Sequence, residues 1–329
     1  MYKIFVTRKI PEAGLNLLKA QKSFRVLVSP HDRVLTKDEL KKNVKGVDAV
    51  LSLLTDKIDS DVLDAAGSQL KIVANYAVGF DNVDLDAAKK RSVIVTNTPG
   101  DLVSEAVAEH TFALIMALAH RIVEADVFTR AEKYKGWEPM EFLGTLLMGK
   151  TLGIVGLGRI GVGVARRAVH GMGMKVIYND QRRNEDFERE YHAEYIPTLD
   201  ALLKKSDVVS LHVPLLPATR HLMSTKQFAL MKPTAFVVNT ARGPVIDEKA
   251  LLVALAKKKI GGVALDVFEC EPAIDCDLTD HLALKKFPNV ILTPHIASAS
   301  TEARDQMAEF AAQNIIAVLS GKAPLNPAA

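Results

Sequence analysis

The sequence contains few cysteines, few aromatic residues and little net charge. Its 329 residues include two cysteines, one tryptophan and 6% aromatic side chains, and the formal net charge is +3. The two cysteines, Cys270 and Cys276, are too few for a disulfide framework, so we expect free thiols and a cytoplasmic protein. No basic tract alternates with aromatic residues, which argues against nucleic acid as a partner.

Long hydrophobic runs are also missing. No uninterrupted apolar stretch reaches the ~20 residues that cross a bilayer. The first residues, Met1 to Val6, are typical of a β-strand rather than of a secretion signal. We therefore expect no membrane partner. With 48% hydrophobic and 25% charged residues the composition is that of a globular protein, and the length favours two domains.

The most informative stretch is Thr151–Asp180. It contains a short apolar run typical of a buried strand, a G-x-G-x-x-G turn, a helical stretch, a second apolar run and a carboxylate. All of these lie within the ~30 residues of a βαβ unit. The turn comprises Gly156, Leu157, Gly158, Arg159, Ile160 and Gly161. This arrangement predicts a dinucleotide site, with the phosphates at the helix N-terminus and Asp180 on the ribose hydroxyls.

The rest of the chain alternates short apolar runs with helical patterns, which predicts α/β domains with parallel sheets. The first 100 residues lack a glycine fingerprint, so their strand-end loops, among them Asn75–Asp81, are candidates for binding a second ligand. A long apolar helix is predicted from Ser104 towards His120, with a more polar continuation to about Lys135. We expect a final amphipathic helix, Thr301–Leu319, to pack on the first domain.

Six residues lie at or just past the ends of predicted strands. In an open α/β sheet, ligands bind beyond the carboxyl ends of the strands, so these residues are expected to line one ligand site. They are Asp180, Pro214, Thr240, Arg242, Asp266 and His295.

A bound dinucleotide indicates hydride transfer, which needs a proton donor and a group that orients the substrate. His295 is the best candidate acid, because its unperturbed pKa is ~6.5, and Glu271 is a candidate partner for the imidazolium. Arg242 offers a planar fork for a substrate carboxylate. From spacing alone, structural roles for these three residues are as compatible with the pattern as catalytic ones.

Six segments together resemble the D-isomer-specific 2-hydroxyacid dehydrogenase family, over the whole length of the chain. They are Asn75–Asp84, Gly156–Gly161, His212–Leu215, Asn239–Asp247, Leu265–Pro272 and Thr293–Ile296. Within that family, Gly136–Gly144 and Lys150–Gly156 are most similar to glyoxylate reductases, also called glyoxylate/hydroxypyruvate reductases.

The resemblance implies two doubly wound parallel-sheet domains. A Rossmann NAD-binding domain, residues 100–296, would be inserted into a flavodoxin-like substrate domain, residues 1–99 and 297–329. It implies Arg242, Glu271 and His295 as the catalytic set. The implied substrate contacts are Val78, Gly79, Arg242 and His295, and the implied cofactor contacts are Gly156, Gly158, Arg159, Ile160, Gly161, Asp180, Pro214, Thr240, Arg242, Asp266 and His295. No metal is implied.

The implied activity is reduction of a small 2-oxoacid to the D-2-hydroxyacid, glyoxylate to glycolate or hydroxypyruvate to D-glycerate, by a homodimer. Asp180 predicts NADH, while Arg182 and Arg183 leave NADP open. One alternative is another D-2-hydroxyacid dehydrogenase, acting on lactate, phosphoglycerate or longer 2-oxoacids. A second alternative is a non-catalytic, NAD-sensing protein like the corepressors that share this fold.

Overall fold

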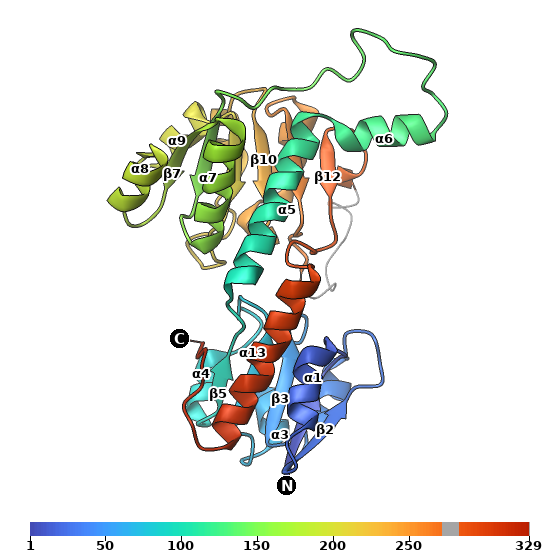
Figure 1. Ribbon diagram of the computed structural model, residues 1–329, viewed down its shortest axis with the longest axis vertical. Helices are drawn as coiled ribbons and strands as arrows, with labels where there is room; N and C mark the ends of the chain where they lie inside the picture. Colours follow the sequence, from blue (N-terminus) through green and yellow to red (C-terminus); the bar gives the residue numbers. More distant parts are fainter. Residues whose placement is uncertain (272–282, 329) are drawn as a thin grey trace. The chain divides into compact units, whose positions relative to one another are not determined.

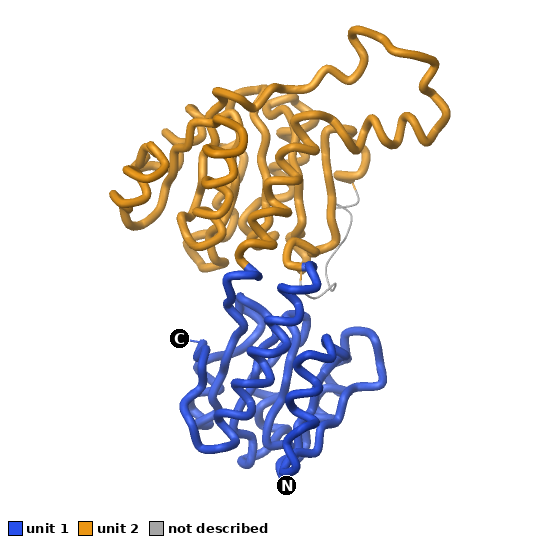
Figure 2. Tube along the Cα trace, in the orientation of Figure 1, with its two compact units in different colours: residues 1–103, 299–329 blue, residues 104–298 orange. Residues whose placement is uncertain are grey.

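The chain forms two compact units in the computed structural model, which describes residues 1–271 and 283–328. The first unit contains residues 1–103 and 299–329, and the second contains residues 104–298 (Figure 2). The domain limits expected from the sequence, after residues 99 and 296, fall within a few residues of these boundaries. The division of substrate and cofactor binding between the units remains a prediction.

The first unit is built on a parallel five-stranded sheet of order β2-β1-β3-β4-β5. This order is that of flavodoxin-like folds, and the buried β-branched runs of the strands suit a sheet covered on both faces. The strands are β1 (Tyr2–Val6), β2 (Phe24–Val28), β3 (Ala49–Leu53), β4 (Ile72–Tyr76) and β5 (Ile94–Thr96). The helices are α1 (Glu12–Lys19), α2 (Lys37–Asn43), α3 (Ser60–Ala66), α4 (Leu85–Lys90) and α13 (Thr301–Leu319).

The C-terminal helix α13 packs against α1 and β4, and lies beside α1 in Figure 1. Its contact face is made of small and aliphatic residues, including Ala308, Ala311 and Ile315, which are buried. Ser300 caps the helix by accepting a hydrogen bond from the Ala303 N–H. The end of the chain therefore completes the core of the N-terminal unit.

The second unit contains a parallel sheet of order β12-β11-β10-β9-β6-β7-β8 within the described residues. The central strand β6 is flanked by β7 on one side and β9 on the other, which is the Rossmann arrangement with its switch point between β6 and β9. The strands are β6 (Thr151–Val155), β7 (Lys175–Asn179), β8 (Glu194–Tyr195), β9 (Val208–Leu211), β10 (Phe236–Asn239), β11 (Gly262–Leu265) and β12 (Val290–Leu292). Both units thus confirm the predicted class of doubly wound parallel sheets.

Helices cover both faces of this second sheet, and each face has its own apolar core. The helices are α5 (Asp101–Ala119), α6 (Ile122–Arg130), α7 (Arg159–Met172), α8 (Glu185–Tyr191), α9 (Leu199–Lys205), α10 (Thr225–Leu230) and α11 (Glu248–Ala256), with a 3₁₀ turn η1 at Gly243–Val245. By length and composition α5 could cross a membrane, but it places Leu114, Ile115 and Leu118 in the core of the unit.

The predicted continuation of the long apolar helix differs from the structure. Helix α5 ends at Ala119, and α6 starts only after Arg121, which has a left-handed φ of 55°. Residues 131–149 then form a loop without helix or strand. Its first part projects away from the sheet of its own unit (Figure 1), and Leu147 near its end is fully buried. We call α6 and this loop, residues 122–149, the arm.

Candidate active site

The glycine turn between β6 and α7 has the geometry that dinucleotide binding requires. Gly156 has a φ of 93°, and a Cβ there would lie 2.8 Å from the carbonyl carbon of His212. A Cβ on Gly161 would lie 2.5 Å from the Gly156 oxygen. A Cβ on Gly158, by contrast, would meet no atom of the described residues within 4 Å. Two glycines therefore allow close packing, and the third leaves open space above the turn.

That open space lies at the N-terminus of α7. Gly158 is the N-cap, and within the described residues no side chain caps this helix end and its first turn carries no acid. The first N–H groups and the positive end of the helix dipole can therefore receive phosphate. The turn fits the pyrophosphate of a dinucleotide, with Arg159 and Ile160 in the first helical turn.

Asp180 is fixed to the same turn, directly after β7. Its Oδ2 accepts a hydrogen bond of 2.6 Å from the Leu157 N–H, and its Oδ1 accepts one of 3.3 Å from the Arg182 N–H. A hollow of about 430 Å³ lies beside it, lined by Leu157, Asp180 and residues 182–186 among others. Asp180 thus stands where it can accept hydrogen bonds from ribose hydroxyls.

The loops after β9 and β10 supply the next predicted residues. The loop at His212–Pro214 approaches the Gly156 turn so closely that a side chain on Gly156 would strike it. Desolvation lowers the pKa of His212 to about 3, so this ring is neutral at pH 7 and cannot serve as the acid. The Thr240 hydroxyl lies 2.7 Å from that of Thr111, on α5.

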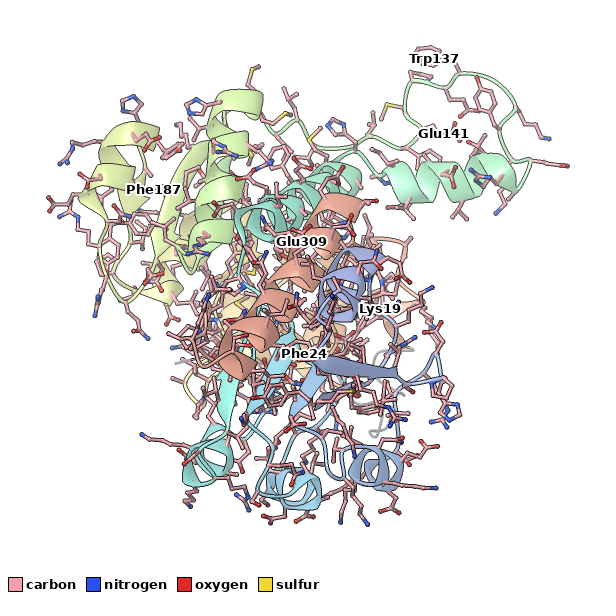
Figure 3. All side chains as sticks on the ribbon, turned by 60° about the horizontal axis from the view of Figure 1, so that its bottom comes forward. Lys19, Phe24, Trp137, Glu141, Phe187 and Glu309 are labelled. Carbon is pink, nitrogen blue, oxygen red and sulfur yellow. The ribbon has the colours of Figure 1, made fainter. Side chains whose placement is uncertain are left out.

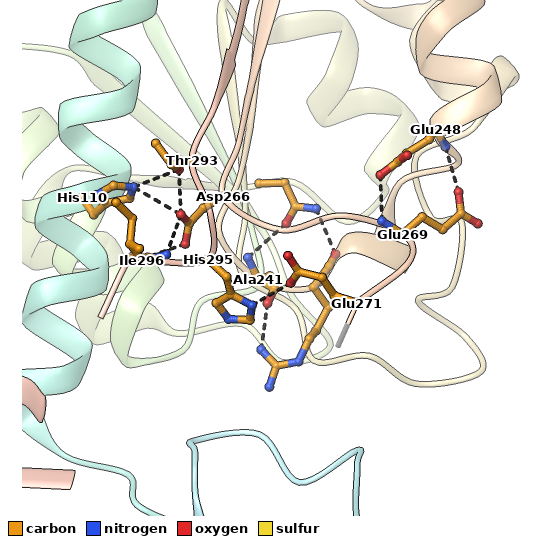
Figure 4. A network of polar contacts seen from close by, with 12 residues as sticks. His110, Ala241, Glu248, Asp266, Glu269, Glu271, Thr293, His295 and Ile296 are labelled. Carbon is orange, nitrogen blue, oxygen red and sulfur yellow. Dashed lines mark hydrogen bonds and ion pairs between the residues drawn. The ribbon is translucent and has the colours of Figure 1, made fainter. Parts of the chain in front are cut away.

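Arg242 lies in a tight turn just after β10. Asn239 organises this turn, since its Oδ1 accepts from the Ala241 N–H at 3.0 Å and its Nδ2 donates to the Arg242 carbonyl at 2.9 Å. The Arg242 Nη1 donates to the Ala241 carbonyl at 2.8 Å (Figure 4). The guanidinium is therefore positioned by its own turn.

His295 and Glu271 form a direct pair. The His295 Nδ1 lies 2.6 Å from the Glu271 Oε2, and both side chains are about three-quarters buried. Because an ionised carboxylate only accepts hydrogen bonds, Nδ1 carries the donated proton, which leaves Nε2 for the substrate. The turn that carries Arg242 packs against the segment that leads to Glu271, since a Cβ on Gly243 would lie 1.7 Å from the Phe268 oxygen. The backbone segments of the three predicted catalytic residues therefore follow neighbouring strands of the sheet, β10, β11 and β12.

Asp266 holds the loop that carries His295. This fully buried carboxylate accepts hydrogen bonds from the Thr293 hydroxyl (2.6 Å) and from the N–H groups of Ile296 (2.9 Å) and Ala297 (2.8 Å). Burial raises its pKa, but these hydrogen bonds and one from His110 outweigh that effect and leave the pKa below its ordinary value. His295 itself has a φ of 55°, so the carboxylate stabilises a backbone that a histidine seldom adopts.

The two remaining predicted residues, Val78 and Gly79, lie in the N-terminal unit, in the loop after β4. Asn97 donates to the Val78 carbonyl at 2.7 Å, and Asn75 donates to the Gly79 carbonyl at 3.1 Å. Two side-chain amides therefore fix the backbone carbonyls of this loop.

A family model described as D-isomer specific 2-hydroxyacid dehydrogenase, NAD binding domain, matches residues 112–297. The chain is also 50% identical over 325 residues to a glyoxylate reductase of Korarchaeum cryptofilum, covering 98% of this chain and 95% of the relative. The chain belongs to the D-isomer-specific 2-hydroxyacid dehydrogenase family.

Two solved structures show how far this likeness extends. A protein from Thermus thermophilus superposes on this dehydrogenase with a TM-score of 0.90 and 40% identity, covering 99% of this chain and 100% of the other. The NADPH-dependent glyoxylate/hydroxypyruvate reductase of Sinorhizobium meliloti, in complex with NADP and malonate, gives a TM-score of 0.83 and 31% identity, covering 100% and 97%. This chain is therefore an NAD(P)-dependent oxidoreductase.

Sequence reasoning missed the supporting residues of this dehydrogenase. His110 was given no role from the sequence, but its Nε2 lies 3.3 Å from the Thr293 hydroxyl and 3.6 Å from Asp266 Oδ1. No sequence signal links α5 to the loop after β12.

Cys270, expected to be a free thiol, is disulfide-bonded. Cys276 lies outside the described residues.

Proposed function

We propose that this dehydrogenase reduces glyoxylate to glycolate, and hydroxypyruvate to D-glycerate, with NADH. The observation that carries the proposal is the His295–Glu271 pair at 2.6 Å, on the unit that also carries Arg242 and the glycine turn. The glyoxylate reductase name of the half-identical relative supports the choice of a two- or three-carbon 2-oxoacid.

The roles follow from the chemistry of each side chain. We assign Arg242 to the substrate carboxylate, which its planar fork can bind with two parallel hydrogen bonds. When bound, the reduced nicotinamide supplies a hydride to the carbonyl carbon. His295 gives its Nε2 proton to the carbonyl oxygen as negative charge develops there. Glu271 orients the ring through Nδ1 and stabilises its charged form.

The substrate contact of the N-terminal unit is assigned to the loop at Val78 and Gly79. Asn75 and Asn97 hold the carbonyls of this loop, which supports the proposal that its N–H groups bind the substrate carboxylate. Asn82 strengthens the arrangement by donating to the carbonyls of Leu53 and Asp56, at 3.1 and 2.9 Å. The amide network supports a rigid anion contact at small entropic cost.

NADH is the proposed cofactor. The cofactor contacts are assigned to Gly156, Gly158 and Asp180 and to further residues of the same strand ends, namely Arg159, Ile160, Gly161, Pro214, Thr240, Arg242, Asp266 and His295. Asp180 is held with its carboxylate towards the hollow, where a 2′-phosphate would meet negative charge.

A homodimer in the cytoplasm is part of the same proposal, because the reaction uses a nucleotide that cells keep inside. The arm supports the dimer, since half of the large apolar side chains that the described residues expose lie on it. Trp137 is 81% exposed and lies far out on the arm (Figure 3). Many exposed apolar side chains on one segment are typical of a protein–protein interface.

The decisive experiment is a panel of 2-oxoacids with NADH and NADPH. We expect the highest kcat/KM with glyoxylate or hydroxypyruvate and NADH. Preference for pyruvate or longer 2-oxoacids would point to another D-2-hydroxyacid dehydrogenase. Cofactor binding with turnover far below ~1 per second on every substrate would favour the NAD-sensing alternative.

Arg242→Lys tests the carboxylate assignment. A point charge cannot replace the bidentate fork, so we expect kcat/KM for glyoxylate to fall at least about 100-fold while NADH binding persists. Lys249→Arg, a matched exchange on the neighbouring helix α11, is the control. Wild-type kcat/KM in Arg242→Lys would show that the guanidinium does not clamp the substrate.

A further inference from the structure

Arg183 lies beside the hollow at Asp180, but its guanidinium is engaged by acids. Its Nε donates to Glu188 Oε1 at 2.9 Å and its Nη2 donates to Oε2 at 2.8 Å. Its Nη1 lies 3.8 Å from Glu185 Oε1. The bidentate geometry uses two of the three guanidinium nitrogens on a single carboxylate, so the positive charge of Arg183 is already neutralised.

The carboxylate that holds Arg183 is itself anchored to the core. The Tyr178 hydroxyl donates to Glu188 Oε1 at 2.7 Å and accepts from the Asn184 N–H at 2.7 Å, and the Tyr178 ring is fully buried. The Arg183 guanidinium and the Tyr178 hydroxyl lower the pKa of Glu188 to about 2. Glu188 is therefore ionised at neutral pH and fixed in place.

The neighbouring arginines differ from Arg183. Arg189 pairs with Asp186, one turn earlier on the exposed side of α8. The Arg182 guanidinium forms no ion pair with any residue in the described part of the chain. The lining of the hollow thus contains three arginines and three acids, Asp180, Glu185 and Asp186. Two of the three arginines, Arg183 and Arg189, are therefore paired with carboxylates of the protein.

We propose that Glu188 is a specificity-determining residue that favours NADH over NADPH by holding Arg183 away from the position of a ribose 2′-phosphate. The inference rests on the proposed function, because it takes Asp180 as the residue that contacts the ribose. A 2′-phosphate brings ~1.5 to 2 negative charges and needs cationic donors that are not shared with other anions. Discrimination is then divided between Asp180, which repels the phosphate, and Glu188, which withholds one of the arginines that line the hollow.

A double-mutant cycle on NADH and NADPH dissociation constants, measured by nucleotide fluorescence, tests this division. The background is Asp180→Ser, which removes the first repulsion. Adding Glu188→Gln, which keeps an acceptor for Tyr178, should raise the NADPH-to-NADH affinity ratio at least about tenfold further, as a new charge-assisted contact would. The gain should shrink at high salt, because the contact is exposed.

Two controls decide whether Arg183 is responsible. With Arg183→Gln added, the gain from Glu188→Gln should disappear. Glu190→Gln, which removes an equal charge from the same helix, should leave the ratio unchanged. An unchanged ratio in Asp180→Ser/Glu188→Gln, or an equal gain without Arg183, would overturn the inference while leaving the reductase proposal intact. A wild-type protein that bound neither nucleotide would overturn both.

Discussion

At the scale of single residues, the site depends on carboxylates that hold backbone and rings in place. Asp266 accepts from two successive backbone N–H groups beside His295, and Glu271 accepts from the ring itself. A neutral amide in either position could accept fewer of these hydrogen bonds. Proton donation by His295 is therefore expected to depend on groups that never touch the substrate.

Glu271→Gln tests this dependence. A neutral amide no longer stabilises the imidazolium, so we expect kcat for glyoxylate to fall by roughly 100-fold or more. The affinity for NADH, measured by fluorescence, should change little. Glu269→Gln, two residues away and paired with His221, is the matched control. Equal losses in both variants would mean that Glu271 acts only on local structure.

Sequence reasoning proposed candidate catalytic residues but not their supports. Arg242 and His295 were proposed from strand-end positions and Glu271 from its chemistry, and the structure pairs His295 with Glu271 at 2.6 Å. Asn239 and His110 were not assigned, because their roles depend on a turn geometry and on a contact between segments about 180 residues apart. Periodicity and spacing carry no information on such contacts.

At the scale of elements, the agreement is best for buried strands and capped helices. The predicted final helix, Thr301–Leu319, has the same limits in the structure, because Ser300 caps it and Gly321 follows it. The break at Arg121 was not predicted, since arginine seldom adopts a left-handed φ and the chain there has no glycine or proline. Ala119, the last residue of α5, is buried and its carbonyl accepts a hydrogen bond from the Thr145 N–H, a contact that local propensity does not report.

The glycine turn offers the clearest element-scale prediction. In Gly158→Ala the new methyl group points into open space at an ordinary φ, so we expect the Tm to stay within a few degrees. The NADH dissociation constant should rise at least about tenfold, because the methyl group occupies the phosphate position. Gly161→Ala is the contrasting variant, and clash with the Gly156 oxygen should lower stability by about 1–3 kcal/mol. Normal NADH binding by Gly158→Ala would rule out the turn as the phosphate site.

At the scale of the whole molecule, the arm is the feature that a monomer does not explain. Val127 is 61% exposed, Met140 75% and Met148 67%, and all three lie within one stretch of 22 residues. Exposing this much apolar surface to water costs free energy, and burying it against another molecule would remove that cost. In our dimer proposal, a second copy of the chain covers these side chains.

Val127→Asp tests that proposal. Burying an unpaired carboxylate in an apolar interface costs several kcal/mol, so we expect the variant to shift from dimer to monomer in sedimentation velocity at micromolar concentration. Val253→Asp makes the same exchange at a site on α11 that is 46% exposed and outside the arm, and it should remain dimeric. If both variants sediment like the wild-type protein, the arm is not the interface. If the wild-type chain is itself a monomer, the dimer proposal is wrong, and the arm must serve some other contact.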